Sequence, residues 1–166
     1  CIVIPAYREA TLENTLSSIL QVAFDIRFEF EVIIHLNQPM NDTRNSTTEI
    51  HNKNESQIKA LQNEGWPLFY ARSTFKDSKK AGVGLARRIG MDAAAKRFCE
   101  IDRANGLIVC LDGDCLVQKN YLQVLLSFYS DSWLSPAASI AYEHQIPMPG
   151  MASAIYQYEL HLRYYI

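Results

Sequence analysis

The strongest indication of the fold is the segment Gly106-Leu107-Ile108-Val109-Cys110-Leu111-Asp112-Gly113-Asp114. Five consecutive apolar residues after a glycine are typical of a strand buried in an α/β sheet. The strand ends in two carboxylates, Asp112 and Asp114, and ligands of such sheets bind beyond the carboxyl ends of the strands. Paired hard oxygen ligands suit Mg²⁺ or Mn²⁺, usually beside nucleotide phosphates. The stretch therefore predicts a cation and phosphate site, against the alternative of an ordinary aspartate- and glycine-rich surface turn.

The composition describes a globular protein with a sizeable core. The chain has 166 residues, of which 48% are hydrophobic and 20% charged, and this predicts a single domain over residues 1–166. A net charge of −2 leaves no basic footprint, which argues against a nucleic-acid partner. The chain opens without methionine and stops inside an apolar-patterned segment, so we expect a C-terminally truncated fragment of a longer protein. The four cysteines form no CxxC pair and are expected to be buried free thiols in a reducing compartment.

Apolar segments of strand and helix periodicity alternate along the chain. Strands are expected at residues 2–5, 30–36, 67–71, 107–111 and 137–142. Helices are expected at residues 12–20, around 58–61, and at 85–93, 122–129 and 155–166, with a polar loop over 38–57. This order predicts a three-layer α/β/α sandwich around a mostly parallel central sheet.

A second motif, Pro5-Ala6-Tyr7-Arg8-Glu9, follows the first expected strand. Pro5 is expected to end the strand ladder and turn the chain over the sheet edge. Tyr7 could border a nucleobase, and Glu9 could accept hydrogen bonds from a base or a ribose. The alternative is a plain strand-to-helix turn in which Glu9 favours the helix N-terminus.

A third motif, Lys79-Lys80-Ala81-Gly82-Val83-Gly84-Leu85-Ala86-Arg87-Arg88-Ile89-Gly90, opens a helix. Its glycines permit close backbone approach, and a helix N-terminus attracts anions, with Lys80, Arg87 and Arg88 adding positive charge near a diphosphate. A GxGxxG dinucleotide fingerprint does not fit, because residues 75–80 are polar and Arg87 occupies the third small position. The alternative is a solvated basic helix start.

The histidines and serines contribute less. His35 lies within an expected strand and is predicted to be a hydrogen-bonded core residue. His144 follows the fifth expected strand and could approach the same sheet edge as an acceptor contact or a metal neighbour. No serine lies in a GxSxG elbow, so serine hydrolase chemistry has no support.

In their order along the chain, these pieces resemble the family 2 glycosyltransferases, which have the GT-A fold. Residues 2–9 are similar to the opening nucleotide-binding strand and turn of that family, and residues 80–90 to its middle element. Leu111-Asp112-Gly113-Asp114 is similar to its metal-binding DxD motif. The resemblance covers nearly the whole chain.

The resemblance implies a Rossmann-like fold and a metal-assisted, inverting transfer of sugar from a nucleotide-diphosphate donor to an acceptor hydroxyl. Asp114 would ligate Mg²⁺ or Mn²⁺, and Asp112 would complete the metal motif and contact the ribose or the sugar. The implied donor-binding residues are Pro5, Ala6, Tyr7, Glu9, Asn37, Lys80, Gly82, Arg87 and Asp112. Asn37 stands where the family commonly has an acidic base-reading residue, so a uridine preference does not follow.

The resemblance also implies partners and a place in the cell. The acceptor would be a saccharide or a lipid-linked molecule, in cell-surface polysaccharide synthesis. The location would be cytoplasmic, extending to the inner face of a membrane with which the full-length protein could associate. The catalytic base of the family is a carboxylate well downstream of DxD, so it is expected beyond residue 166, and Glu143 is not favoured in that role.

Three other functions compete with this interpretation. A haloacid dehalogenase-like phosphatase would use Asp112 as its nucleophile, but Leu116 stands where its motif needs Thr or Val, and its motif belongs on a first strand. A nucleotidyltransferase would need a glycine-rich loop after the first strand, where Ala6-Tyr7-Arg8 stands. A non-catalytic module that binds a nucleotide sugar is the third.

Overall fold

The computed structural model describes residues 1–23, 29–76, 82–131, 136–146 and 148–164. They form two compact units, Cys1–Leu126 and Ser127–Ile166. In chain order the elements are β1 (Ile2–Ala6), α1 (Leu12–Ala23), β2 (Val32–Pro39), α2 (Asn45–Asn63), β3 (Leu68–Phe75), α3 (Val83–Glu100), β4 (Val109–Cys110), α4 (Tyr121–Asp131), the 3-10 turn η1 (Pro149–Met151) and α5 (Ala152–Tyr164).

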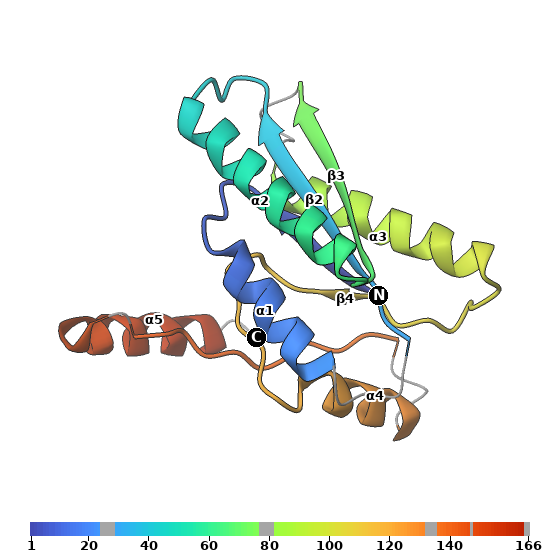
Figure 1. Cartoon of the computed structure of the whole chain (residues 1–166). Helices are drawn as coiled ribbons and strands as arrows, with labels where there is room; N and C mark the ends of the chain where they lie inside the picture. Colours follow the sequence, from blue (N-terminus) through green and yellow to red (C-terminus); the bar gives the residue numbers. More distant parts are fainter. Residues whose placement is uncertain (24–28, 77–81, 132–135, 147, 165–166) are drawn as a thin grey trace. The chain divides into compact units, whose positions relative to one another are not determined.

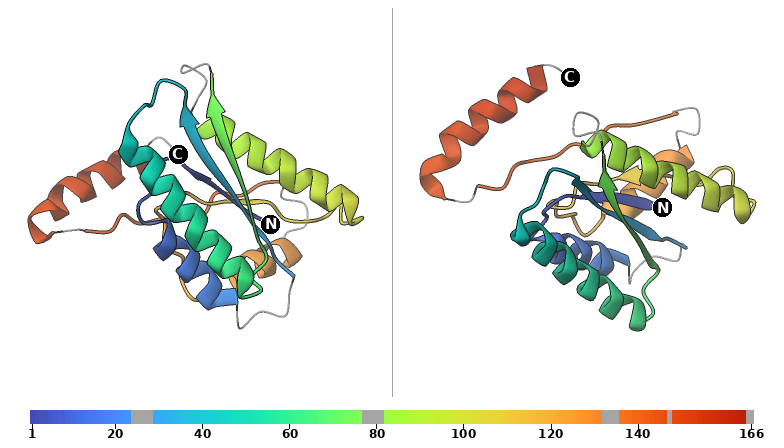
Figure 2. Two further views of the ribbon diagram at one scale, coloured as in Figure 1. Left: turned by 45° about the horizontal axis from the view of Figure 1, so that its top comes forward. Right: turned by 90° about the horizontal axis from the view of Figure 1, so that it is seen from above.

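The first unit is built on a parallel sheet of four strands in the order β3-β2-β1-β4. Helices α1 and α2 cover one face of this sheet and α3 covers the other (Figures 1 and 2). The alternation along β1 explains the layers, because successive side chains of a strand point to opposite faces. Ile2 and Ile4 pack in the core that contains α1, whereas Val3 packs with Ala94 of α3. The predicted α/β/α architecture with a parallel sheet is confirmed.

Pro5 lies inside β1, and the prediction that it ends the ladder is wrong. The strand continues to Ala6, and Pro5 pairs in register with His35 of β2. The carbonyls of Cys1 and Val3 accept hydrogen bonds from the β4 side, so residue 5 presents its nitrogen to that same side. Since β4 ends at Cys110, the missing N–H of proline removes no ladder bond there.

Helix α2 begins at Asn45, inside the segment predicted to be a loop. Its buried positions are Thr47, His51, Asn54 and Ile58, spaced by four, three and four residues. This is the period of a helix face that packs on a sheet. The apolar pattern missed it because three of the four buried side chains are polar.

Other boundaries also differ from the expectations. Strand β2 runs on to Pro39 and β3 to Phe75, so both reach further than predicted, while β4 has only two residues. The strand expected at 137–142 is wrong, since the described residues 136–146 form none. The final predicted helix is confirmed as α5, none of whose described residues is buried.

Two predictions about individual side chains have different outcomes. His35 is a hydrogen-bonded core residue as predicted: it is 1% exposed, and its ring nitrogens contact the Ala86 carbonyl and the Ser73 hydroxyl at 3.2 and 2.9 Å. All four cysteines are free, but Cys99 is exposed and the others are only partly buried. Among the described residues, no helix combines the length and apolar character needed to cross a membrane.

Candidate functional site

An open cleft of about 310 Å³ lies where the parallel strands of the first unit end. It is lined by Pro5, Tyr7, Glu9, Asn37, Gly82, Val83, Asp112, Gly113 and Asp114. Seven of these were predicted from the sequence: Pro5, Tyr7, Glu9, Asn37, Gly82, Asp112 and Asp114. The fold thus brings together three motifs that are separated by tens of residues in the chain.

The remaining predicted residues have different positions. Arg87 reaches the cleft through Asp112, with its Nη2 2.6 Å from Oδ1 of the carboxylate. Ala6 is fully buried in the core, so its methyl group packs against the α1 side of the sheet. Lys80 lies outside the described residues. His144 belongs to the second unit, where its Nδ1 lies 3.1 Å from Glu159.

Three carboxylates give the cleft an acidic wall. Glu9 is partly buried, and the pKa of its carboxyl is raised, first by burial and then by the negative charges of Asp114 and Asp112. Gly113 allows this crowding: a Cβ placed there would lie 2.8 Å from Glu9 Cγ and 3.4 Å from the Pro5 carbonyl oxygen. A glycine between the aspartates therefore lets the loop after β4 approach the loop after β1.

The acidic wall supplies only part of a metal coordination sphere. In the described part of the chain, no three His, Cys, Asp or Glu side chains are grouped so as to hold a metal ion. Mg²⁺ in nucleotide sites is usually held by one or two carboxylates, with phosphates and water completing its octahedron. Asp112 and Asp114 fit that mode of binding, in which the ligand brings part of the site.

The opposite charge comes from α3. Arg87 lies in the first turns of this helix, and its Nε is buried with no hydrogen-bond partner among the described residues. Gly82 caps the helix in an extended conformation and offers no side-chain cap to the first amides. A helix N-terminus and an unpaired guanidinium N–H are both suited to an anion such as a phosphate.

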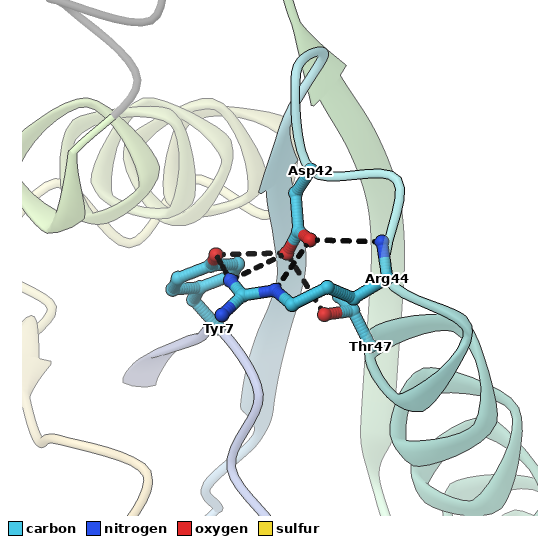
Figure 3. Close-up of polar contacts among 4 residues, drawn as sticks. All are labelled: Tyr7, Asp42, Arg44 and Thr47. Atoms are coloured by element: carbon cyan, nitrogen blue, oxygen red, sulfur yellow. Dashed lines mark hydrogen bonds and ion pairs between the residues drawn. The ribbon is translucent and has the colours of Figure 1, made fainter.

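Tyr7 is held at the edge of the cleft by a polar cluster that the sequence did not predict (Figure 3). Its hydroxyl donates to Asp42 Oδ2 at 2.8 Å and accepts from Arg44 Nη2 at 2.7 Å. Thr47 also donates to Asp42 Oδ2 at 2.8 Å, and the Asp42 side chain is only 3% exposed. Hydrogen bonds from Arg44 hold the pKa of Asp42 far below its usual range. Burial and the Asp42 carboxylate raise the pKa of the Tyr7 phenol.

Helix α2 contributes Thr47 to this cluster and also supplies a second anchor for the loop after β1. Asn54, 1% exposed, donates from Nδ2 to the Glu9 carbonyl oxygen at 2.9 Å. No apolar pattern in the sequence marks Thr47 or Asn54 as buried. The polar residues Thr47, His51 and Asn54 recur at helical spacing, and this pattern was the signal that could have identified the buried face of α2.

Asn37 gives the cleft a buried amide at the end of β2. It is 3% exposed, and its Oδ1 has no hydrogen-bond partner among the described residues. A buried unpaired acceptor is costly unless a donor reaches it. An amide can meet a ligand edge that presents a donor beside an acceptor.

Comparison with known proteins agrees with this fold. The family model described as Glycosyl transferase family 2 matches residues 1–145. No curated protein matches the chain. The chain belongs to glycosyl transferase family 2, and its four-stranded parallel sheet flanked by helices is consistent with the Rossmann-like GT-A fold.

Proposed function

We propose that the cleft binds a nucleotide-diphosphate sugar, and that the protein transfers the sugar to an acceptor hydroxyl with the help of a divalent cation. One observation carries this proposal. The two aspartates after β4, the loop after β1 and the start of α3 line a single cleft, with Arg87 on Asp112. Membership of the glycosyl transferase family supports the reaction class.

The nucleoside would bind on the side of Tyr7 and Asn37. Tyr7 offers a ring fixed by two hydrogen bonds, which suits stacking against a base. Asn37 offers an amide whose Oδ1 has no hydrogen-bond donor among the described residues. Because this amide both donates and accepts, it accommodates more than one base, and Pro5 and Glu9 would border the ribose.

The diphosphate would lie between α3 and the acidic loop. Arg87 and the first amides of α3 would bind its phosphate oxygens. Asp114, with Asp112, would hold Mg²⁺ or Mn²⁺ beside them. When bound, the ion supplies Lewis-acid stabilisation of the negative charge on the departing nucleoside diphosphate. Arg87 would bind the same charge from the protein side, which favours departure over return.

The acceptor side needs a base. A direct displacement by a saccharide or lipid-linked hydroxyl inverts the anomeric centre and requires a group that removes the hydroxyl proton. The carboxylates of the cleft are assigned here to the donor and the cation. The proposed reaction therefore draws its base from a residue outside the cleft-lining set.

Thermal unfolding in the presence of UDP, GDP, CDP or dTDP, with and without Mn²⁺, tests the proposal. At least one diphosphate should raise the unfolding midpoint more with Mn²⁺ than without it, and Asp114→Ala should abolish the part of the shift that depends on Mn²⁺. Asp92→Ala is the matched control, since Asp92 lies exposed on α3 and pairs with Arg88. Equal shifts with and without Mn²⁺ would contradict the metal-assisted role. Release of nucleoside diphosphate from a bound donor distinguishes a transferase from a module that only binds.

A further inference from the structure

The loop that carries both aspartates has little regular structure to hold it. Strand β4 has two residues and pairs with β1 only at Ile2–Val109 and Val3–Cys110. The amide of Leu111 adds one bond to the Val3 carbonyl, 3.0 Å long. From Asp112 to Asn120 the chain forms neither strand nor helix. The position of the carboxylates therefore depends on contacts made by other elements.

Thr15 of α1 makes one of those contacts. Its side chain is fully buried, and its hydroxyl donates to the carbonyl oxygen of Gly113 at 2.8 Å. Gly113 is the residue between the two aspartates, and its other side lies against Glu9. The hydroxyl thus fixes the backbone of the residue that stands between the two aspartates.

Ser18, one turn further along α1, fixes the same loop again. Its Oγ donates to the Thr15 carbonyl at 2.8 Å and accepts from the amide of Val117 at 3.2 Å. Two hydroxyls of one helix face therefore bind backbone groups at both ends of residues 113–117. A buried hydroxyl on a packed helix is a rigid anchor, because its rotamer is fixed by the surrounding core.

We propose that Thr15 is a positioning residue for Asp112 and Asp114, whose hydroxyl sets the place at which they bind the cation of a metal–nucleotide complex. This inference rests on the proposed function of the cleft. Thr15 contacts the backbone of the loop and acts only through the two aspartates. Its loss should therefore weaken binding that needs the metal and leave metal-free nucleotide binding unchanged. Misplacement of ligands by fractions of an ångström is enough for such an effect.

The experiment compares Thr15→Val with Thr15→Ser, and with Ser17→Ala as a control on the exposed face of the same helix. The nucleoside diphosphate that stabilises the wild type is titrated by calorimetry with Mn²⁺ and with EDTA. Thr15→Val should raise the Kd measured with Mn²⁺ about tenfold, which is the effect of losing one well-placed bond, and should not change the Kd measured with EDTA. Thr15→Ser should restore the wild-type value, and Ser17→Ala should match it.

The outcomes separate the two proposals. A wild type that shows no Mn²⁺-dependent binding overturns the proposed function, and this inference with it. A wild type that binds, with Thr15→Val equal to it or equally weakened in both buffers, overturns only the positioning role. Should Thr15→Val not unfold cooperatively, Ser18→Ala takes its place, and the same selective loss is expected because it frees the Val117 end of the loop.

Discussion

Arg87 on α3 places its Nη2 2.6 Å from Oδ1 of Asp112. One of the two candidate metal ligands is therefore paired with a guanidinium group of the protein. Both side chains are substantially exposed, at 36% and 54%, so the ion pair is screened by water and contributes little to stability. The Nε of Arg87 nevertheless has no partner in the described part of the chain. This pairing is therefore expected to matter for ligand binding more than for folding.

Arg87→Gln should weaken binding of a nucleoside diphosphate about tenfold, the typical effect of one lost charge-assisted bond to phosphate. Binding of the corresponding nucleoside should not change, because it has no phosphate. Calorimetry with both ligands measures the difference. Arg88→Gln is the control, since Arg88 is 79% exposed and pairs with Asp92 on the same helix. Equal losses for nucleoside and diphosphate would place Arg87 away from the phosphates.

Tyr7 should contribute through its ring more than through its hydroxyl. Tyr7→Phe keeps the stacking surface and removes the bonds to Asp42 and Arg44, whereas Tyr7→Ala removes the surface itself. Base stacking on an aromatic ring is worth about 1–3 kcal/mol, so Tyr7→Ala should lower nucleotide affinity at least about fivefold. Tyr7→Phe should lower it less, by loosening the ring. Fluorescence titration of both variants measures this order, and the reverse order would refute stacking.

His51 should make the fold sensitive to mild acid. It is fully buried on α2, and neither ring nitrogen has a hydrogen-bond partner among the described residues. Its pKa is lowered from the ordinary 6.5, first by burial and then by the charge of Arg72, while Asp42 opposes the shift. The unfolded chain therefore takes up this proton first, so the free energy of unfolding should decrease as the pH falls below about 6.5.

Unfolding in denaturant at pH 7.5 and at pH 5.5 measures the effect of His51. His51→Leu should lose less stability between these two pH values than the wild type, because it has no ring to protonate. His161→Gln serves as the control, since His161 is exposed on α5. An identical pH dependence in the wild type and His51→Leu would assign the acid sensitivity to other groups.

Any side chain at Gly113 should lower the free energy of unfolding. Gly113→Ala places a methyl group 2.8 Å from Glu9 Cγ and 3.4 Å from the Pro5 oxygen, so the two loops must move apart. We expect a loss of about 1–2 kcal/mol in the free energy of unfolding, as for overpacking elsewhere. Gly84→Ala is the matched control, because a Cβ there meets open space within α3 and should stabilise the helix by about 0.5 kcal/mol.

The Gly113 clash also has a specific rescue. Adding Glu9→Ala removes the Cγ atom that the new methyl group would meet, so the double variant should recover part of the lost stability. Chemical denaturation of the single and double variants gives the coupling between the two positions. Simple additivity would show that the strain lies elsewhere in the loop.

The strands and the acidic loop could be predicted from the sequence, because each is marked by residues that are adjacent in the chain. Continuous apolar residues at 2–4 and 107–111 mark buried parallel strands, and Asp112 and Asp114 follow the last of them directly. The start of helix α2 could not be predicted in this way. Apart from Ile58, its buried residues are the polar Thr47, His51 and Asn54, which apolar periodicity does not detect. Asp42 and Arg44 could not be identified either, since their partner Tyr7 is more than thirty residues away.

The parallel α/β fold and the motifs that meet at its edge could be predicted from the amino-acid sequence, because both follow from short-range apolar patterning and from the chemistry of adjacent side chains. The contacts that hold those motifs in place became visible only in the folded chain: the Thr15 hydroxyl on the Gly113 carbonyl, the Asn54 amide on the Glu9 carbonyl, and the Asp42 cluster around Tyr7. These are hydrogen bonds between distant parts of the chain. The sequence position of a hydroxyl or an amide does not indicate its hydrogen-bond partner, because three-dimensional packing determines which groups come into contact.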